Sequence, residues 1–93
     1  MAKYDYKGNA AIDRRNELLS FGHLRLRFKP DSTVLIEVYQ FINYYYLYTE
    51  KHTINGNDIT TIDSFYQITK IDKEEYERMI SWYKPQEVKY GGF

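Results

Sequence analysis

The chain contains no cysteine, and only two prolines and two histidines occur among its 93 residues. Without cysteine, disulfide bonds and thiolate chemistry are excluded, and so are the cross-links that small secreted domains usually need. Thirteen basic residues balance thirteen acidic ones, so the chain lacks the basic excess typical of nucleic-acid-binding proteins. No apolar run approaches the length of about 18 residues that suggests a membrane span. The N-terminal residues MAKYDYKGNA have no signal-peptide pattern. These absences favour a cytoplasmic protein that does not contact a membrane.

Tyrosine, in contrast, is abundant, and it supplies 11 of the aromatic residues. A chain that is 43% hydrophobic is too apolar for a disordered protein, and its length suits one small domain covering residues 1–93. Residue types with AT-rich codons (Ile, Asn, Lys, Tyr, Phe) number 38, against 15 for those with GC-rich codons (Gly, Ala, Arg, Pro). This bias indicates an AT-rich genome, as in many bacteria and phages.

Residues 9–20 are predicted to form a helix. Their apolar side chains fall near one face at helical spacing. Asn9 is a suitable N-cap, and Gly22 follows closely enough to end the helix. Residues 1–8 are polar and aperiodic, so we expect a loose arm before this helix.

A second helix is predicted after Asp72, whose carboxylate can cap it while Glu75 completes a capping box. An apolar stripe follows at spacings i, i+3, i+4 and i+7. It consists of Tyr76, Met79, Ile80 and Tyr83. Pro85 is expected to end this helix, which leaves residues 86–93 as a loose tail or a short edge strand.

A first hairpin is predicted between the helices. In residues 23–28, HLRLRF, apolar residues alternate with Arg25 and Arg27, as in a half-buried strand. The segment KPDS, residues 29–32, suits a type I turn with its proline and aspartate in the middle. Residues 33–41 are rich in β-branched side chains and are expected to return as the second strand.

A second hairpin is predicted from residues 43–54 and residues 57–69. Asn55-Gly56 between them is a strong hairpin signal, because both turn positions favour positive φ. Residues 57–69 also fit a helical face that Asp58 could cap, although their threonine and β-branched content favours a strand.

The predicted order is therefore helix, two hairpins, helix. This order indicates an α+β fold with a small antiparallel sheet of about four strands, flanked by an N-terminal and a C-terminal helix. We expect both helices to pack on one face of that sheet.

The chain has few groups that could perform catalysis. His23 and His52 do not lie at metal-ligand spacing from another histidine, and both are expected to be ordinary surface histidines. None of the serines lies in a nucleophile elbow, and the glycines form no phosphate-binding loop. Glu50, Asp58 and Asp63 could converge on Mg²⁺ across the second hairpin, but any sheet surface offers such groups. The sequence therefore predicts a protein that is not an enzyme and binds no metal or cofactor.

The segment FINYYYLYTE, residues 41–50, places Tyr44, Tyr46 and Tyr48 on one face of a strand, because alternate residues point the same way. If the helices cover the other face, these tyrosines are exposed, and exposed apolar patches usually mark binding sites. Alternatively, the tyrosines pack around the helices as an ordinary core.

The function predicted from this pattern is binding to a larger protein. Tyr44, Tyr46 and Tyr48 would be the anchors and Arg25 and Arg27 would set the register, since Tyr and Arg are enriched at binding hot spots. Such a protein would block or modulate its partner, as small phage and mobile-element inhibitors of host enzymes do. Two alternatives remain: the same face could stack bases of a nucleic acid or nucleotide, or it could pair with a second copy as a homodimer.

Overall fold

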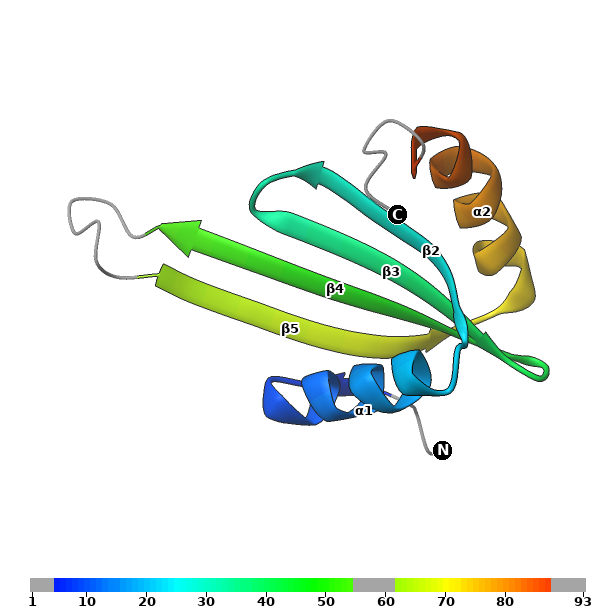
Figure 1. Cartoon of the computed structure of the whole chain (residues 1–93), viewed down its shortest axis with the longest axis horizontal. Coiled ribbons are helices and arrows are strands. Elements are labelled where there is room, and N and C mark those ends of the chain that lie inside the picture. The colour runs from blue at the N-terminus through cyan, green and yellow to red at the C-terminus, as the bar shows by residue number, and fades with distance from the viewer. Residues whose placement is uncertain (1–4, 55–61, 88–93) are drawn as a thin grey trace.

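The computed structural model describes residues 5–54 and 62–87 and has an α+β architecture (Figure 1). The elements in chain order are β1 (Asp5–Lys7), α1 (Asn9–Ser20), β2 (Leu24–Asp31), β3 (Val34–Phe41), β4 (Tyr44–Ile54), β5 (Ile62–Ile71) and α2 (Lys73–Glu87). The strands form one antiparallel sheet in the order β1-β5-β4-β3-β2. The predicted class and its two flanking helices are confirmed, but the sheet has five strands rather than about four.

The extra strand comes from the segment that was expected to be a loose arm. Asp5–Lys7 pairs with β5, with Lys7 opposite Gln67, and covers part of an edge that would otherwise be open. Gly8 follows with φ of 64°, and its N–H donates to the Tyr66 carbonyl at 2.9 Å. Gly8, rather than Asn9, is therefore the N-cap of α1, because this left-handed conformation suits glycine.

The two helices cover opposite faces of the sheet (Figure 1). The neighbouring β3 residues Val38 and Tyr39 point to opposite faces. Tyr39 belongs to the core cluster that contains Ala11 and Leu18 of α1, whereas Val38 packs in a second cluster with Met79 of α2. The prediction that both helices share one face is wrong, because β3 and β4 bring bulky apolar side chains to both faces.

The predicted Asp72 cap of α2 is confirmed, but the Glu75 carboxylate pairs with Arg78 Nη1 at 2.6 Å instead of completing a capping box. The Glu75 N–H donates to Asp72 Oδ1 at 2.8 Å, and the predicted apolar stripe packs against the sheet. The helix continues to Glu87, so the prediction that Pro85 ends it is wrong. A proline inside a helix lacks the N–H that would bond to residue i−4, and Pro85 lies in the last turn of α2, where one such bond is lost. Residues 88–93 lie outside the described part of the chain.

The β2–β3 turn lies further along the chain than predicted. Asp31 is opposite Val34, so Ser32 and Thr33 occupy the turn. The Asp31 Oδ1 atom accepts hydrogen bonds from the Thr33 N–H at 2.7 Å and from its hydroxyl at 2.6 Å. Pro30 therefore belongs to β2, where it is tolerated because β2 is an edge strand.

β5 confirms the strand prediction for the part that the structure describes. Its pairing with β4 runs from Ile54 opposite Ile62 to Tyr45 opposite Ile71, which excludes the helical alternative over residues 62–69. The predicted Asn55-Gly56 turn, like the rest of residues 55–61, lies outside the described residues.

Candidate interaction surface

The three tyrosines that were expected to form an open face share one face, but α1 covers two of them. Tyr46 and Tyr48 are buried in the α1 core cluster, and Tyr48 is only 1% exposed. Tyr44, by contrast, is 45% exposed. The expected exposure of Tyr46 and Tyr48 is therefore wrong, because α1 packs on the face that was predicted to be open.

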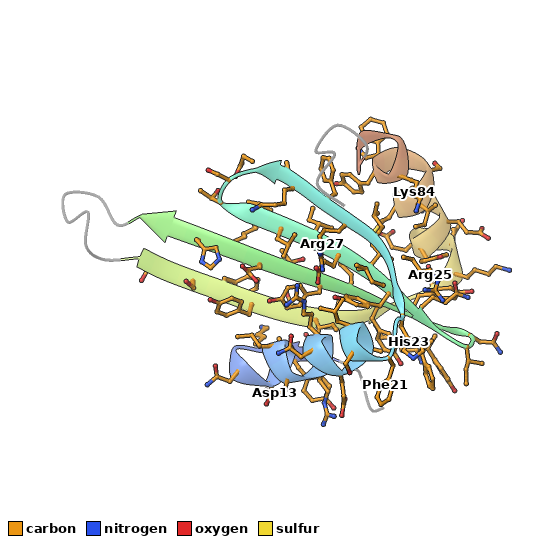
Figure 2. All side chains as sticks on the ribbon, in the orientation of Figure 1. Asp13, Phe21, His23, Arg25, Arg27 and Lys84 are labelled. Carbon is orange, nitrogen blue, oxygen red and sulfur yellow. The ribbon has the colours of Figure 1, made fainter. Side chains whose placement is uncertain are left out.

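The two predicted arginines both lie on β2, and Arg25 is the nearer of the two to α2 (Figure 2). Arg27 Nε donates to Glu37 Oε2 at 2.6 Å. A register shift separates the pairings of Leu24 and Leu26, and Arg25, between them, donates to the carbonyls of Gly22 and Leu24, each at 3.1 Å. The predicted surface of three exposed tyrosines and two arginines is therefore not formed, because Tyr46 and Tyr48 are buried.

The carboxylate of Glu37 lies between α1 and the sheet and has no exposed surface. Arg15 of α1 donates to both of its oxygens, at 2.7 and 2.9 Å, and Tyr39 and Arg27 also donate to it. Burial opposes ionisation, but the hydrogen bonds from Arg15 and Tyr39 and the two guanidinium charges outweigh it and lower the pKa of Glu37. This cluster joins α1 to the sheet.

A second polar chain lies further along the same face. Tyr48 donates to Glu50, Glu50 Oε2 lies 2.8 Å from His52 Nε2, and His52 Nδ1 lies 2.8 Å from Ser64 Oγ. The sequence analysis did not find this arrangement. The Glu-x-His spacing on a strand could have indicated that Glu50 and His52 share a face. That Ser64 lies beside them follows only from the register between β4 and β5.

Exposed apolar side chains gather at one end of the molecule. In the described residues, six large apolar side chains are exposed, and four of them flank the α1–β2 and β3–β4 connections. These four, which we call the end patch, are Phe21, Phe41, Ile42 and Tyr44. Phe21 is 74% exposed and Ile42 is 66% exposed. Of the five residues predicted to bind a partner, only Tyr44 belongs to the end patch.

The turn that ends α1 presents Phe21 to solvent. Gly22 adopts φ of 79°, and its N–H donates to the Leu19 carbonyl while the His23 N–H donates to the Leu18 carbonyl, each at 3.0 Å. This is a Schellman motif, which reverses the chain after the helix. Phe21 consequently lies outside the core, and the predicted role of Gly22 in ending the helix is confirmed.

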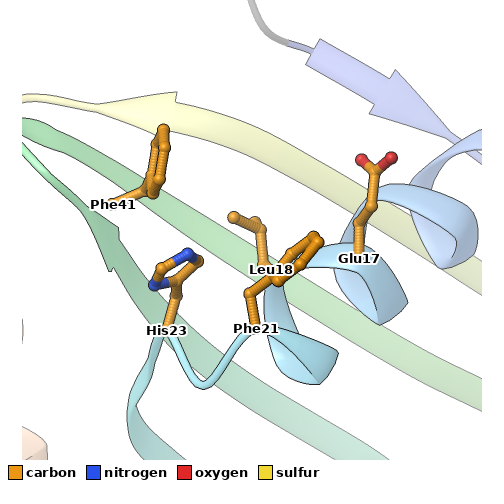
Figure 3. Close-up of a pocket in the computed structure, with 5 residues that line it drawn as sticks. All are labelled: Glu17, Leu18, Phe21, His23 and Phe41. Atoms are coloured by element: carbon orange, nitrogen blue, oxygen red, sulfur yellow. The ribbon is translucent and has the colours of Figure 1, made fainter.

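A shallow hollow of about 220 Å³ opens beside the end patch (Figure 3). It is lined by Glu17, Leu18, Phe21, His23 and Phe41. The His23 ring contacts the Phe41 ring with centroids 4.8 Å apart. Small-molecule pockets usually measure about 300–1,000 Å³, so this hollow suits one large apolar side chain better than a whole ligand.

Ile42 occupies a strained position in the two-residue turn between Phe41 and Tyr44. Its φ is 56°, a left-handed value that is a genuine outlier for a β-branched residue. Glycine or asparagine would be expected in such a turn. The exposed isoleucine therefore lowers the stability of the fold without filling its core.

Comparison with protein families, curated proteins and solved structures finds no match to this chain. Over residues 5–54 and 62–87, no helix is long and apolar enough to cross a membrane. The same residues contain no group of three or more His, Cys, Asp or Glu side chains that could hold a metal ion.

Proposed function

We propose that this chain is a small cytoplasmic protein-binding module whose end patch contacts a larger protein and blocks or modulates it. The gathering of four exposed apolar side chains at one end of the molecule, where Phe21 and Phe41 also line the hollow, is the observation that supports this proposal. Exposed apolar patches on small domains are commonly binding sites. The partner would insert an apolar side chain into the hollow and surround the end patch with its own surface.

The size of the end patch fits the core of such an interface. Because a fully exposed aromatic side chain presents about 200 Å², the four side chains together expose roughly 450 Å². A standard interface buries about 800 Å² on each partner, with an apolar centre and a polar rim. The end patch would therefore supply the centre, and neighbouring polar residues would supply the rim.

Extension of the sheet by a partner strand is less favoured. β1 has three residues, and β2 is interrupted by two register shifts and contains Pro30. Lys84 of α2 also donates to the Arg25 carbonyl at 3.2 Å. Such features protect edge strands from pairing, so we expect side chains rather than backbone groups to make the contact.

The proposal is tested by capture of the partner from a lysate of the source organism. We expect the variant Phe21→Ser/Phe41→Ser to lose a nuclease-resistant partner, with affinity at least ten-fold weaker, since central aromatic side chains dominate binding energy. Phe65→Ser is the matched control, because Phe65 and Phe41 are equally exposed, at 41%. Phe65 lies far along β5 from the end patch.

Equal capture by both variants would contradict the proposal. A partner that disappears after nuclease treatment would favour the nucleic-acid alternative. A solution mass of two chains that falls to one chain in the double variant would favour a homodimer through the end patch.

Ile42→Gly is expected to change stability and binding in opposite directions. A left-handed non-glycine residue costs of the order of 1–3 kcal/mol, and glycine followed by asparagine suits a hairpin turn. We therefore expect the free energy of unfolding to rise by about 1 kcal/mol, measured by urea denaturation. Binding to the captured partner should weaken about ten-fold, because an anchor of the end patch is removed.

Ile42→Ala is the control for this experiment, because it removes most of the side chain and keeps a non-glycine residue at the same φ. It should weaken binding without raising stability. If Ile42→Gly stabilises the protein and leaves binding unchanged, Ile42 is not a binding residue.

A further inference from the structure

The polar chain on β4 and β5 contains a serine, a histidine and a carboxylate in hydrogen-bonded order. Ser64 Oγ lies 2.8 Å from His52 Nδ1, and His52 Nε2 lies 2.8 Å from Glu50 Oε2. Tyr48 donates to the other Glu50 oxygen at 2.9 Å. His52 and Ser64 are directly opposite each other in the sheet, so the backbone holds the pair in place.

The hydrogen bonds determine which ring nitrogen carries the proton. An ionised carboxylate only accepts hydrogen bonds, so Glu50 selects the neutral ring in which Nε2 carries the hydrogen. Burial raises the pKa of Glu50, but hydrogen bonds from His52 and Tyr48 outweigh this and keep the pKa below its usual value. His52 Nδ1 is then an acceptor for the Ser64 hydroxyl hydrogen, which is the arrangement of a nucleophile with its general base.

We propose that Ser64 is an activated nucleophile that accepts acyl groups from reactive esters, with His52 as general base and Glu50 as positioning residue. Ser64 Oγ forms a bond to the ester carbonyl carbon, and its proton moves to His52 Nδ1. The bond from that carbon to the leaving oxygen breaks, and the leaving alcohol takes the proton from His52. The products are an acyl ester on Ser64 and a free alcohol, with no oxidant or reductant involved.

The strand geometry also offers a donor for the developing oxyanion. The His52 N–H donates to the Thr33 carbonyl at 2.9 Å, so His52 and Ser64 form a non-hydrogen-bonded pair and the Ser64 N–H points away from β4. The Ser64 N–H therefore faces the side of β5 on which β1 lies. The pairing of β1 ends at Lys7 opposite Gln67, so no described strand lies opposite Ser64 on that side. The amide of the nucleophile itself is a common oxyanion donor.

One donor gives less stabilisation than the two of a complete oxyanion hole, where loss of one donor slows the reaction about 10²–10³-fold. Ser64 is also exposed on a sheet surface. The substrate class is therefore an acyl ester with a phenolic leaving group, which needs little oxyanion stabilisation. Alkyl esters are not expected to react at a comparable rate.

The test uses the full chain and p-nitrophenyl acetate, with acetylated residues identified by mass spectrometry over time. Ser64 should be acetylated at least ten-fold faster than Ser81, an exposed serine of α2 in the same molecule. His52→Ala should reduce acetylation of Ser64 to the rate of Ser81, and imidazole in the buffer should restore it. Glu50→Gln should slow the reaction and Glu50→Asp should recover part of the rate, which a merely structural role would not produce.

Acetylation of Ser64 no faster than that of Ser81 in the wild-type chain would overturn the proposal. So would an unchanged rate in a folded His52→Ala variant. The comparison of the two serines needs no substitution, so it decides the question even if His52→Ala does not fold. None of these outcomes depends on the end patch, so the proposed binding function is tested separately.

Discussion

Replacing Glu37 with glutamine is expected to lower the free energy of unfolding by about 3–5 kcal/mol, because it removes one partner of a buried ion cluster. Glu37 has no exposed surface and receives hydrogen bonds from Arg15, Arg27 and Tyr39. A glutamine side chain cannot neutralise the two guanidinium charges, and its amide nitrogen would oppose one of their donors. Since small domains have only about 5–15 kcal/mol of stability, most of the margin would be lost.

Urea denaturation followed by circular dichroism measures this change. Glu17→Gln is the control, because Glu17 pairs with Arg14 at 3.2 Å on the surface, where both side chains are largely exposed. Surface pairs of this kind contribute about 0–1 kcal/mol. Similar losses in the two variants would show that the Glu37 cluster has no special importance for stability.

The same carboxylate is expected to make the protein sensitive to acid. Its pKa in the folded state lies below the ordinary value of 4.5. A carboxyl group with a depressed folded pKa contributes stability above its unfolded pKa, and this contribution is lost as pH falls through the folded pKa. Wild-type stability should therefore decline below about pH 4.5, and in Glu37→Gln that part of the decline should be absent.

Tyr48→Ala is expected to lower the free energy of unfolding by about 3–5 kcal/mol, the usual cost of removing a buried aromatic side chain. Tyr48 lies under α1, and the Arg15 guanidinium lies 5.3 Å from its ring centroid. Its hydroxyl also donates to Glu50 at 2.9 Å. The variant would therefore leave a cavity beneath the helix and remove one hydrogen bond from the Glu50 carboxylate.

Tyr44→Ala is the matched control on the same strand and the same face. Tyr44 lies at the exposed end and contacts Lys70, whose Nζ is 4.6 Å from its ring centroid. We expect a loss below about 1 kcal/mol, since exposed cation–π contacts contribute about 0.5–1 kcal/mol. If Tyr44→Ala proves as costly as Tyr48→Ala, α1 does not divide this face into a covered part and an open part.

The fold was predictable where the signals were local. Helix 9–20, the Asp72 cap and the apolar stripe of α2 follow from spacings within a few residues, and all three are confirmed. The sides on which the helices pack were predicted wrongly, although Tyr45 and Tyr46 are adjacent and therefore place bulky side chains on both faces of the sheet. Strands that are buried on both faces give continuous apolar runs, and YYLY, residues 45–48, is such a run.

The candidate sites were less predictable, because they depend on register and on turns. Tyr46 and Tyr48 were correctly predicted to share one face, but that face was expected to be open, and their burial depends on where α1 packs. Ser64 meets His52 only through the pairing of β4 with β5, and the register of a strand cannot be fixed from its own residues alone. The left-handed conformation of Ile42 could not be predicted, because a β-branched side chain favours a strand whereas this turn position requires positive φ.

The pairing of β1 with β5 also affects how the chain folds during synthesis. Asp5 lies opposite Thr69, and the Gln67 side chain donates to the Asp5 carboxylate at 3.0 Å. β1 therefore has no partner until β5 has been made, and the face on which α1 rests is incomplete until then. Contacts this distant in sequence slow folding. The surface beneath α1 would thus stay partly open until β5 has been made, because Ile68 of β5 belongs to the same core cluster as Ala11 and Leu18.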